Sequence, residues 1–253
     1  MNKDLAPLKE LDNISEFSVA ETWMLLKPTW SLREDLLKYI LMDLLTRQVL
    51  MLSKEKFVRK NDRRKPKTYV FIRQGPNFSN HKVQEHEVVV LNFFQKPTNR
   101  YFIKVLLKKL YKTTYQLGTV KESVSKTLIS KGFIPKHSIG SLFSAYPLTK
   151  KGKEKQAQIK RILNYVNSRI TKISNNQEEL KQVLNNLGPN FILLDNLDIT
   201  LSKTISKTIS SFDIALSNTF DSWDYFTAYD LLFDYDFSFN DFDFDFGDNS
   251  SSD

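Results

Sequence analysis

The residues with the clearest chemical potential are the cations between positions 54 and 73. Nine lysines and arginines stand there against Glu55 and Asp62. Because so many like charges repel one another without counterions, we expect this stretch to contact phosphates, each cation contributing about 1 kcal/mol near an anionic surface. A solvated loop is the alternative. No pattern of aromatic residues accompanies the bases, so sequence-specific reading of nucleic-acid bases is not indicated. The cations expected to make the contact are Arg59, Lys60, Arg63, Arg64, Lys65 and Lys67.

Other kinds of chemistry find little support in the sequence. The chain has no cysteine, which excludes disulfides, thiolate metal sites and cysteine nucleophiles. His81 and His86 flank the acidic pair Glu85 and Glu87, but their spacing matches no metal-binding motif, and the seven glycines build no phosphate-binding loop. No serine stands in a nucleophile-elbow motif. We therefore expect a protein that is not an enzyme and that holds no metal and no cofactor.

The net charge of +8 conceals two opposite segments. All 37 basic residues lie within residues 1–212 together with 18 of the 29 acidic residues, so this part carries +19. Residues 213–253 contain eleven Asp and no other charged side chain, and aromatic residues alternate with Asp there. A strongly basic body is typical of proteins that bind nucleic acid or an anionic membrane. The composition of the tail predicts disorder; the tail either competes for the basic body or only keeps the protein soluble.

Helical and strand patterns alternate along the basic part. Capping boxes that begin at Ser18 and Ser31 predict helices over residues 19–26 and 32–45. Short strands are predicted at residues 49–52 and 68–72, on either side of the cationic stretch. Helix, strand, basic hairpin and strand form the layout of a winged helix. The pattern at residues 128–134 repeats that at residues 44–50, which predicts a second, similar half with a strand near Gly132.

The remaining apolar patterns are mostly helical. Residues 88–91 form a strand or begin a helix, and further helices are predicted over 100–111, 119–130 and 178–187 and, less regularly, 191–209. Thr149 is the predicted N-cap of a long amphipathic helix that carries Lys and Arg opposite its apolar stripe. The predicted fold class is mainly α with short β-hairpins, arranged as tandem winged-helix-like halves in one compact domain.

Several short motifs, taken in order, resemble the Golgi phosphoprotein 3 family. The motifs are Ala20-Glu21-Thr22-Trp23-Met24-Leu25-Leu26, Arg47-Gln48-Val49-Leu50, Tyr115-Gln116-Leu117-Gly118-Thr119-Val120-Lys121-Glu122, Leu128-Ile129-Ser130-Lys131-Gly132-Phe133-Ile134 and Tyr146-Pro147-Leu148-Thr149. The resemblance covers roughly residues 15–175 and extends loosely to about 212. It divides the chain into an N-terminal extension over 1–14, a Golgi phosphoprotein 3-like helical domain over 15–212 and an acidic aromatic tail over 213–253.

The resemblance implies a peripheral membrane protein in the cytoplasm. Members of that family bind phosphoinositide headgroups and the cytosolic tails of membrane proteins, so an anionic membrane surface and such tails are the expected partners, and homo-oligomerisation stays open. The family's headgroup pocket uses a Trp and several Arg; Trp30, Lys38 and Lys121 stand at or beside those positions. The family's membrane-contacting hairpin falls on residues 133–143, whose apolar residues are expected to be exposed. The four singled out are Phe133, Ile134, Leu142 and Phe143.

A winged-helix nucleic-acid-binding protein is the alternative. It explains the basic hairpin and the repeated pattern without a lipid. A helix that enters the major groove needs a polar outer face. The Leu-rich helix offers few such side chains, namely Arg33, Lys38, Asp43 and Arg47. The leading interpretation is therefore the membrane adaptor.

Overall fold

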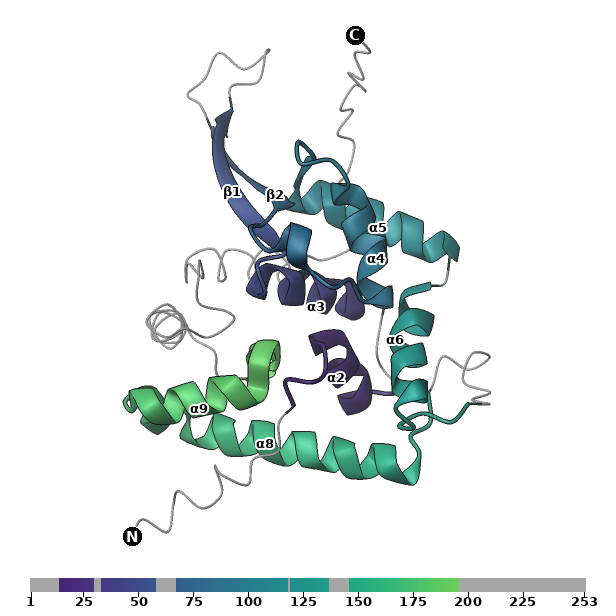
Figure 1. The fold of residues 1–253 in the computed structure, drawn as a ribbon, viewed down its shortest axis with the longest axis vertical. Coiled ribbons are helices and arrows are strands. Elements are labelled where there is room, and N and C mark those ends of the chain that lie inside the picture. The colour runs from purple at the N-terminus through teal and green to yellow at the C-terminus, as the bar shows by residue number, and fades with distance from the viewer. Residues whose placement is uncertain (1–13, 30–32, 58–66, 118, 137–145, 196–253) are drawn as a thin grey trace.

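The computed structural model describes residues 14–29, 33–57, 67–117, 119–136 and 146–195 (Figure 1). Within them the protein is mainly helical with one small antiparallel sheet, as the sequence predicts. None of the helices in these ranges combines the length and the apolar character that crossing a membrane requires.

Helices α2 (Val19–Leu26) and α3 (Arg33–Thr46) form the centre of the fold over the described residues. The capping box that begins α2 is present, since Ser18 Oγ accepts from the backbone N–H of Glu21 at 3.2 Å and the Glu21 carboxylate accepts from that of Ser18 at 2.9 Å. Every residue of α3 between positions 36 and 44 is buried. Because α2, α5, α6 and β1 all contact α3, its whole circumference packs inside the protein.

A three-stranded sheet follows α3. β1 (Leu50–Phe57) and β2 (Lys67–Gln74) form an antiparallel hairpin in which Leu50 pairs with Gln74. Both strands are longer than predicted. Residues 100–102, predicted as the start of a helix, instead form β3 (Arg100–Phe102) beside β2. The ring of Phe102 stacks on that of Phe71 at 4.2 Å, a cross-strand pairing that draws this segment onto the sheet before helix α5 (Ile103–Leu117) begins.

The other helices largely agree with their predicted ranges. They are α4 (Val88–Leu91), α6 (Thr119–Ser130), α8 (Lys150–Ser174) and α9 (Gln177–Leu187), with short 3₁₀ turns at η1 (Phe78–Asn80), η2 (Glu85–Glu87), η3 (Asn92–Phe94) and η4 (Gly188–Leu193). Two further predictions were wrong within the described residues. The residues around Gly132 form a turn and no strand. Of the helix predicted over 191–209, residues 191–193 belong to η4 and residues 194–195 are not helical, while residues 196–209 lie outside the described residues.

Figure 1 shows how these elements are arranged. α8 and α9 lie side by side along one side of α2, and the β1–β2 hairpin projects beyond α3 on the opposite side. Buried apolar residues from all the α-helices form one continuous core. α8 and the β1–β2 hairpin therefore lie on opposite sides of α2 and α3.

Candidate anion-binding site

The start of α8 is fastened to the end of α6. Gly132, at φ 77°, ends α6 in a Schellman motif, in which the backbone N–H of Phe133 donates to the carbonyl of Leu128 at 2.9 Å. Thr149, the N-cap of α8, donates from its backbone N–H to the Phe133 carbonyl at 2.9 Å and from its hydroxyl to the Gly132 carbonyl at 2.8 Å. These bonds fix the position of the Phe133 side chain relative to the first turns of α8.

The segment before α2 is held by the far end of the described chain. The buried side-chain amide of Asn190 donates to the carbonyls of Ile14 and Phe17 at 2.9 and 3.0 Å. The backbone N–H groups of Ile14 and Ser15 donate to the carbonyl of Asn186 at 3.0 and 3.1 Å. As a result Phe17 is anchored next to Phe133, with 5.6 Å between the two ring centroids.

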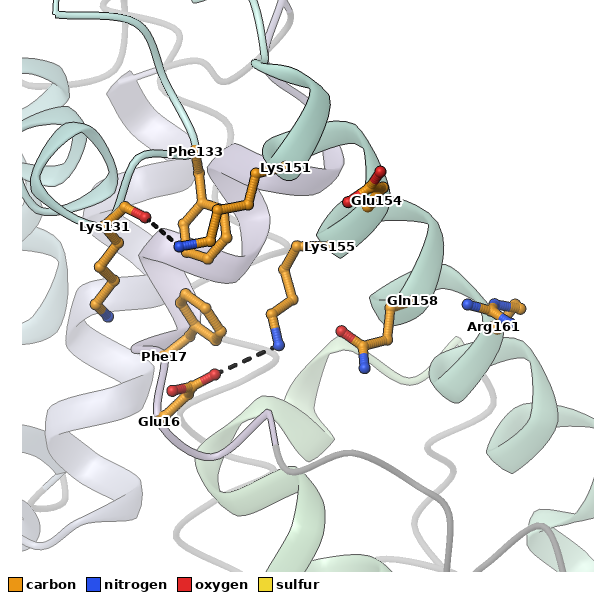
Figure 2. A pocket seen from close by; sticks show the side chains of 9 residues that line it. All are labelled: Glu16, Phe17, Lys131, Phe133, Lys151, Glu154, Lys155, Gln158 and Arg161. Atoms are coloured by element: carbon orange, nitrogen blue, oxygen red, sulfur yellow. Dashed lines mark hydrogen bonds and ion pairs between the residues drawn. The ribbon is translucent and has the colours of Figure 1, made fainter.

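A pocket of about 620 Å³ lies where these three segments meet (Figure 2). Its volume falls within the range typical of small-molecule sites. Basic, acidic and aromatic side chains line it, the largest share coming from α8. The lining residues are Glu16, Phe17, Lys131, Phe133, Lys151, Glu154, Lys155, Gln158 and Arg161.

Three of the four cations in the pocket lie over its two aromatic rings. The ammonium groups of Lys131 and Lys155 are 4.4 and 5.3 Å from the centroid of Phe17. That of Lys151 is 4.9 Å from the centroid of Phe133 and donates to the Lys131 carbonyl at 2.8 Å. Figure 2 shows these side chains converging around the rings. Such cation–π contacts hold flexible lysines near one position before any ligand arrives.

Carboxylates offset only part of this charge. Glu16 accepts from Lys155 at 3.4 Å, and the buried Glu21, just outside the pocket lining, lies 3.6 Å from Lys131. Burial raises the pKa of the Glu21 carboxyl, and the charge of Lys131 opposes that rise. Within the lining, four cations face two carboxylates, Glu16 and Glu154. The arrangement can attract an anion. Phe17 and Phe133 are themselves buried, so an apolar part of that anion would meet the methylene stems of the lysines that lie on the two rings.

Comparison of the chain with models of known families, with curated proteins and with solved structures found no match.

The residues expected to form a headgroup pocket have unlike environments. Lys38 is buried, with 9% of its surface exposed. Burial raises the pKa of the Asp35 carboxyl, and the charge of Lys38 opposes that rise. Lys121 is half-buried on α6 beside the first turn of α3; burial lowers its pKa, Arg33 lowers it further, and Glu34 opposes the shift. Trp30 lies outside the described residues.

The backbone of the predicted basic hairpin is confirmed up to its tip. Lys67 begins β2 and pairs with Phe57. The other five cations expected to contact phosphates lie outside the described residues: Arg59, Lys60, Arg63, Arg64 and Lys65.

The expectation that Phe133 and Ile134 are exposed was wrong. Their exposed fractions are 5% and 1%, because the turn after α6 packs both side chains into the core. Leu142 and Phe143, at the other end of the predicted membrane hairpin, lie outside the described residues. Phe133 instead contributes one of the two rings of the pocket.

Sequence reasoning identified the basic character of α8 but not the pocket. Lys131 and Phe17 stand far from α8 in the chain, and no local pattern links the three segments. The one available signal was the pair of predicted N-caps, Ser18 and Thr149, which place Phe17 directly before α2 and Lys151 in the first turn of α8.

A second charged cluster, which the sequence did not reveal, is buried between α3 and η2. Arg47 donates to Asp43 at 2.8 Å and forms an ion pair with Glu87, whose carboxylate also contacts the His81 ring at 2.7 Å. Burial would raise the pKa of Glu87, but Arg47 and hydrogen bonds hold it below its usual value. Because the charges are mutually paired, this cluster fits a structural role. No group of residues suited to a metal ion occurs in the described ranges.

Proposed function

We propose that this protein is a non-enzymatic peripheral membrane adaptor that binds the headgroups of anionic phospholipids. The observation that carries the proposal is the charge of α8. Over its 25 residues it holds eight lysines and arginines against one acid, Glu154. At 1.5 Å per residue, the cations from Lys150 to Lys172 form a cationic strip about 33 Å long on one rigid element. The exposed cations of the strip are Lys150, Lys151, Lys153, Lys160, Arg161 and Lys172.

A flat anionic surface suits this strip better than a DNA groove does. In a winged helix the helix before the hairpin enters the groove, and its side chains must be exposed to reach the bases. That helix is α3, and none of its residues from Arg33 to Thr46 is exposed. That the two halves are winged-helix domains stays a prediction, and nucleic-acid binding is the alternative that the experiment must exclude.

The proposed attachment is electrostatic. Phe133 and Ile134 are buried and do not form an apolar tip that inserts into lipid. Each lysine near an anionic surface contributes about 1 kcal/mol, and the attraction falls off within a Debye length of about 10 Å at 0.1 M salt. The resemblance to the Golgi phosphoprotein 3 family suggests the same class of function, with the cytosolic tails of membrane proteins as further partners.

Co-sedimentation with vesicles tests the proposal. The full chain should pellet with phosphatidylcholine vesicles that contain phosphatidylserine, and not with phosphatidylcholine alone. Reversing two exposed charges of the strip, in Lys153→Glu with Lys160→Glu, should weaken vesicle binding at least about tenfold. The control, Lys82→Glu with Lys96→Glu, makes the same change in net charge at exposed positions outside α8 and should weaken binding less.

Two outcomes would overturn the proposal. One is equal loss in both pairs of variants, which would mean that net charge and not α8 determines binding. The other is release from the vesicles by duplex DNA at physiological salt, which would favour the nucleic-acid alternative.

A further inference from the structure

We propose that the acidic aromatic segment over residues 220–246 docks in the basic pocket of its own chain, the one formed by Phe17, Lys131, Phe133 and the first turns of α8. The inference goes beyond membrane binding and does not depend on it. It identifies the pocket as a peptide-binding surface whose occupant is acidic and aromatic.

The segment is both acidic and rich in aromatic residues. It holds eight Asp and no Glu, Lys or Arg, and twelve of its 27 residues are aromatic. From Asp241 to Phe246 carboxylates and rings alternate without interruption. A short peptide from this segment therefore presents carboxylates and aromatic rings to one site at the same time.

The pocket complements both the acidity and the aromatic content of the segment. Lys131, Lys151 and Lys155 line the pocket with ammonium groups to which an incoming carboxylate can bind. Phe17 and Phe133 are only 2% and 5% exposed beneath these ammonium groups, so an incoming ring packs on the methylene stems of the lysines and lies beside their charges. An inorganic anion would use only the cations, whereas an Asp–Phe peptide also uses this apolar surface. Glu16, Glu154 and the adjacent Glu21, which pairs with Lys131, repel the segment, but the four cations of the lining outnumber these three carboxylates.

The described chain ends close enough for the segment to reach. Asp195 is tied to α8, since its backbone N–H donates to the Asn167 side chain at 3.1 Å and its carboxylate accepts from the same side chain at 3.0 Å. Arg161, which lines the pocket, lies six residues before Asn167 on the same helix, a distance of about 9 Å along its axis. Twenty-four residues separate Asp195 from Phe220. Even at the 1.5 Å per residue of an α-helix, the most compact of the common regular conformations, a chain of that length spans about 36 Å, which is longer than this separation along α8.

The absence of cysteine makes a direct test simple. In the full chain, Ser238→Cys introduces one thiol into the segment, to which a nitroxide spin label is attached. The spin label broadens amide NMR signals of residues close to it. We expect the signals of Lys131, Phe133 and Lys151 to fall to less than half of their intensity in the diamagnetic control, while signals of the β1–β2 hairpin stay unchanged.

Variants of the pocket show whether the contact depends on it. Lys151→Glu with Lys155→Glu should restore the intensities. Lys153→Glu with Lys160→Glu makes the same charge change on α8 away from the pocket and should leave the broadening in place. This control pair lies in the cationic strip and the first pair lies in the pocket. Failure of lipid binding therefore shows in the vesicle assay of the control pair, and failure of docking shows in the NMR intensities of the pocket pair.

Variants of the segment leave every residue of the described core unchanged. Asp241→Asn, Asp243→Asn and Asp245→Asn together should restore the intensities. The matched triple Asp213→Asn, Asp248→Asn and Asp253→Asn removes the same number of charges outside residues 220–246 and should not.

Three outcomes would overturn the inference. The first is the absence of broadening at the pocket. The second is broadening that survives the pocket double variant while that variant keeps a native spectrum. The third is equal broadening when spin-labelled protein without ¹⁵N is mixed with ¹⁵N protein that carries no spin label, because the occupant would then be the tail of a second copy.

Discussion

Gly152, in the first turn of α8, lies directly against the backbone carbonyl of Phe133. A Cβ added at Gly152 would lie 2.3 Å from the Phe133 oxygen and 3.2 Å from the Cβ of Leu148. The Phe133 carbonyl also accepts the backbone N–H of Thr149 at 2.9 Å. The close approach that only glycine permits is therefore what joins the end of α6 to the start of α8, and it places Lys131 and Lys151 in one pocket.

The first prediction concerns the stability of this junction. Replacing a glycine by alanine inside an exposed helix normally stabilises it by about 1 kcal/mol. At Gly152 the new Cβ meets backbone atoms that cannot rotate away, so Gly152→Ala should lower the free energy of unfolding by about 1–3 kcal/mol. Urea denaturation measures the change. Lys153→Ala, one residue later and exposed, should stay within about 0.5 kcal/mol of the parent, and a stabilised Gly152→Ala would contradict the packing described.

The second prediction concerns the buried ionic cluster. Asp43 is buried and pairs with Arg47 at 2.8 Å, and Arg47 also pairs with Glu87. Asp43→Asn keeps the shape of the side chain but removes its charge. Burial raises the pKa of the Asp43 carboxyl, with Glu87 adding to the rise and Arg47 opposing it, and Arg47 keeps its pair with Glu87 in the variant. No buried charge is therefore left unpaired, and we expect the free energy of unfolding to fall by about 1–3 kcal/mol, the worth of the lost charge-assisted hydrogen bond, as measured by urea denaturation.

An exposed ion pair supplies the control for Asp43. Glu55 and Arg100 pair at 2.6 Å across the sheet with about a third and a half of their side chains exposed. Glu55→Gln should cost less than about 1 kcal/mol, because solvent screens exposed pairs. Equal losses in the two variants would mean that the cluster around Asp43 adds nothing beyond an ordinary surface pair.

The third prediction is a pH dependence that arises at His86. Burial lowers the pKa of His86 to about 4, with Arg47 and Lys131 acting in the same direction and Glu87 and Glu85 against it. In the unfolded chain the pKa of histidine is about 6.5, so between pH 6.5 and 4 the unfolded state binds more protons than the folded state. Stability should therefore fall as the pH drops through this window, by about 3 kcal/mol from His86 alone.

A comparison of two proteins isolates this contribution from those of the carboxylates. Urea denaturation at pH 7 and pH 4 of the parent and of His86→Gln gives two pH-dependent losses of stability. The loss in the variant should be the smaller by about 3 kcal/mol. If both proteins lose the same amount, His86 does not titrate as its burial indicates.

The sequence predicted the local elements well because their signals are local. The helix at residues 19–26 has the predicted bounds, since the capping box of Ser18 and Glu21 marks its start in the sequence. Thr149 begins α8 for the same kind of reason. The strand Arg100–Phe102 was missed because it exists through its partners on β2: Phe102 pairs with Phe71, which lies 31 residues earlier in the chain.

The candidate site was less predictable than the fold. An alternating or helical pattern does not distinguish a buried apolar residue from an exposed one at a turn, so Phe133 was assigned to the surface although the core covers it. The pocket depends on the bond from Asn190 to Ile14, which joins residues 176 positions apart. The buried cluster of Asp43 and Arg47 was likewise read as an exposed helix face, since charged residues at that spacing usually are one.

The last prediction joins the two proposals, and it concerns the effect of the tail on lipid binding. If the acidic segment occupies the pocket beside the cationic strip, its carboxylates repel an anionic membrane and occupy cations that the membrane would otherwise contact. Asp241→Asn, Asp243→Asn and Asp245→Asn together should then tighten binding to phosphatidylserine vesicles several-fold at 0.01 M salt, where charges act over about 30 Å. At 0.15 M salt the difference from the parent should shrink, because the range falls to about 8 Å. The matched triple at Asp213, Asp248 and Asp253 separates docking from net charge: equal tightening in both triples would show that the tail acts only through its total charge.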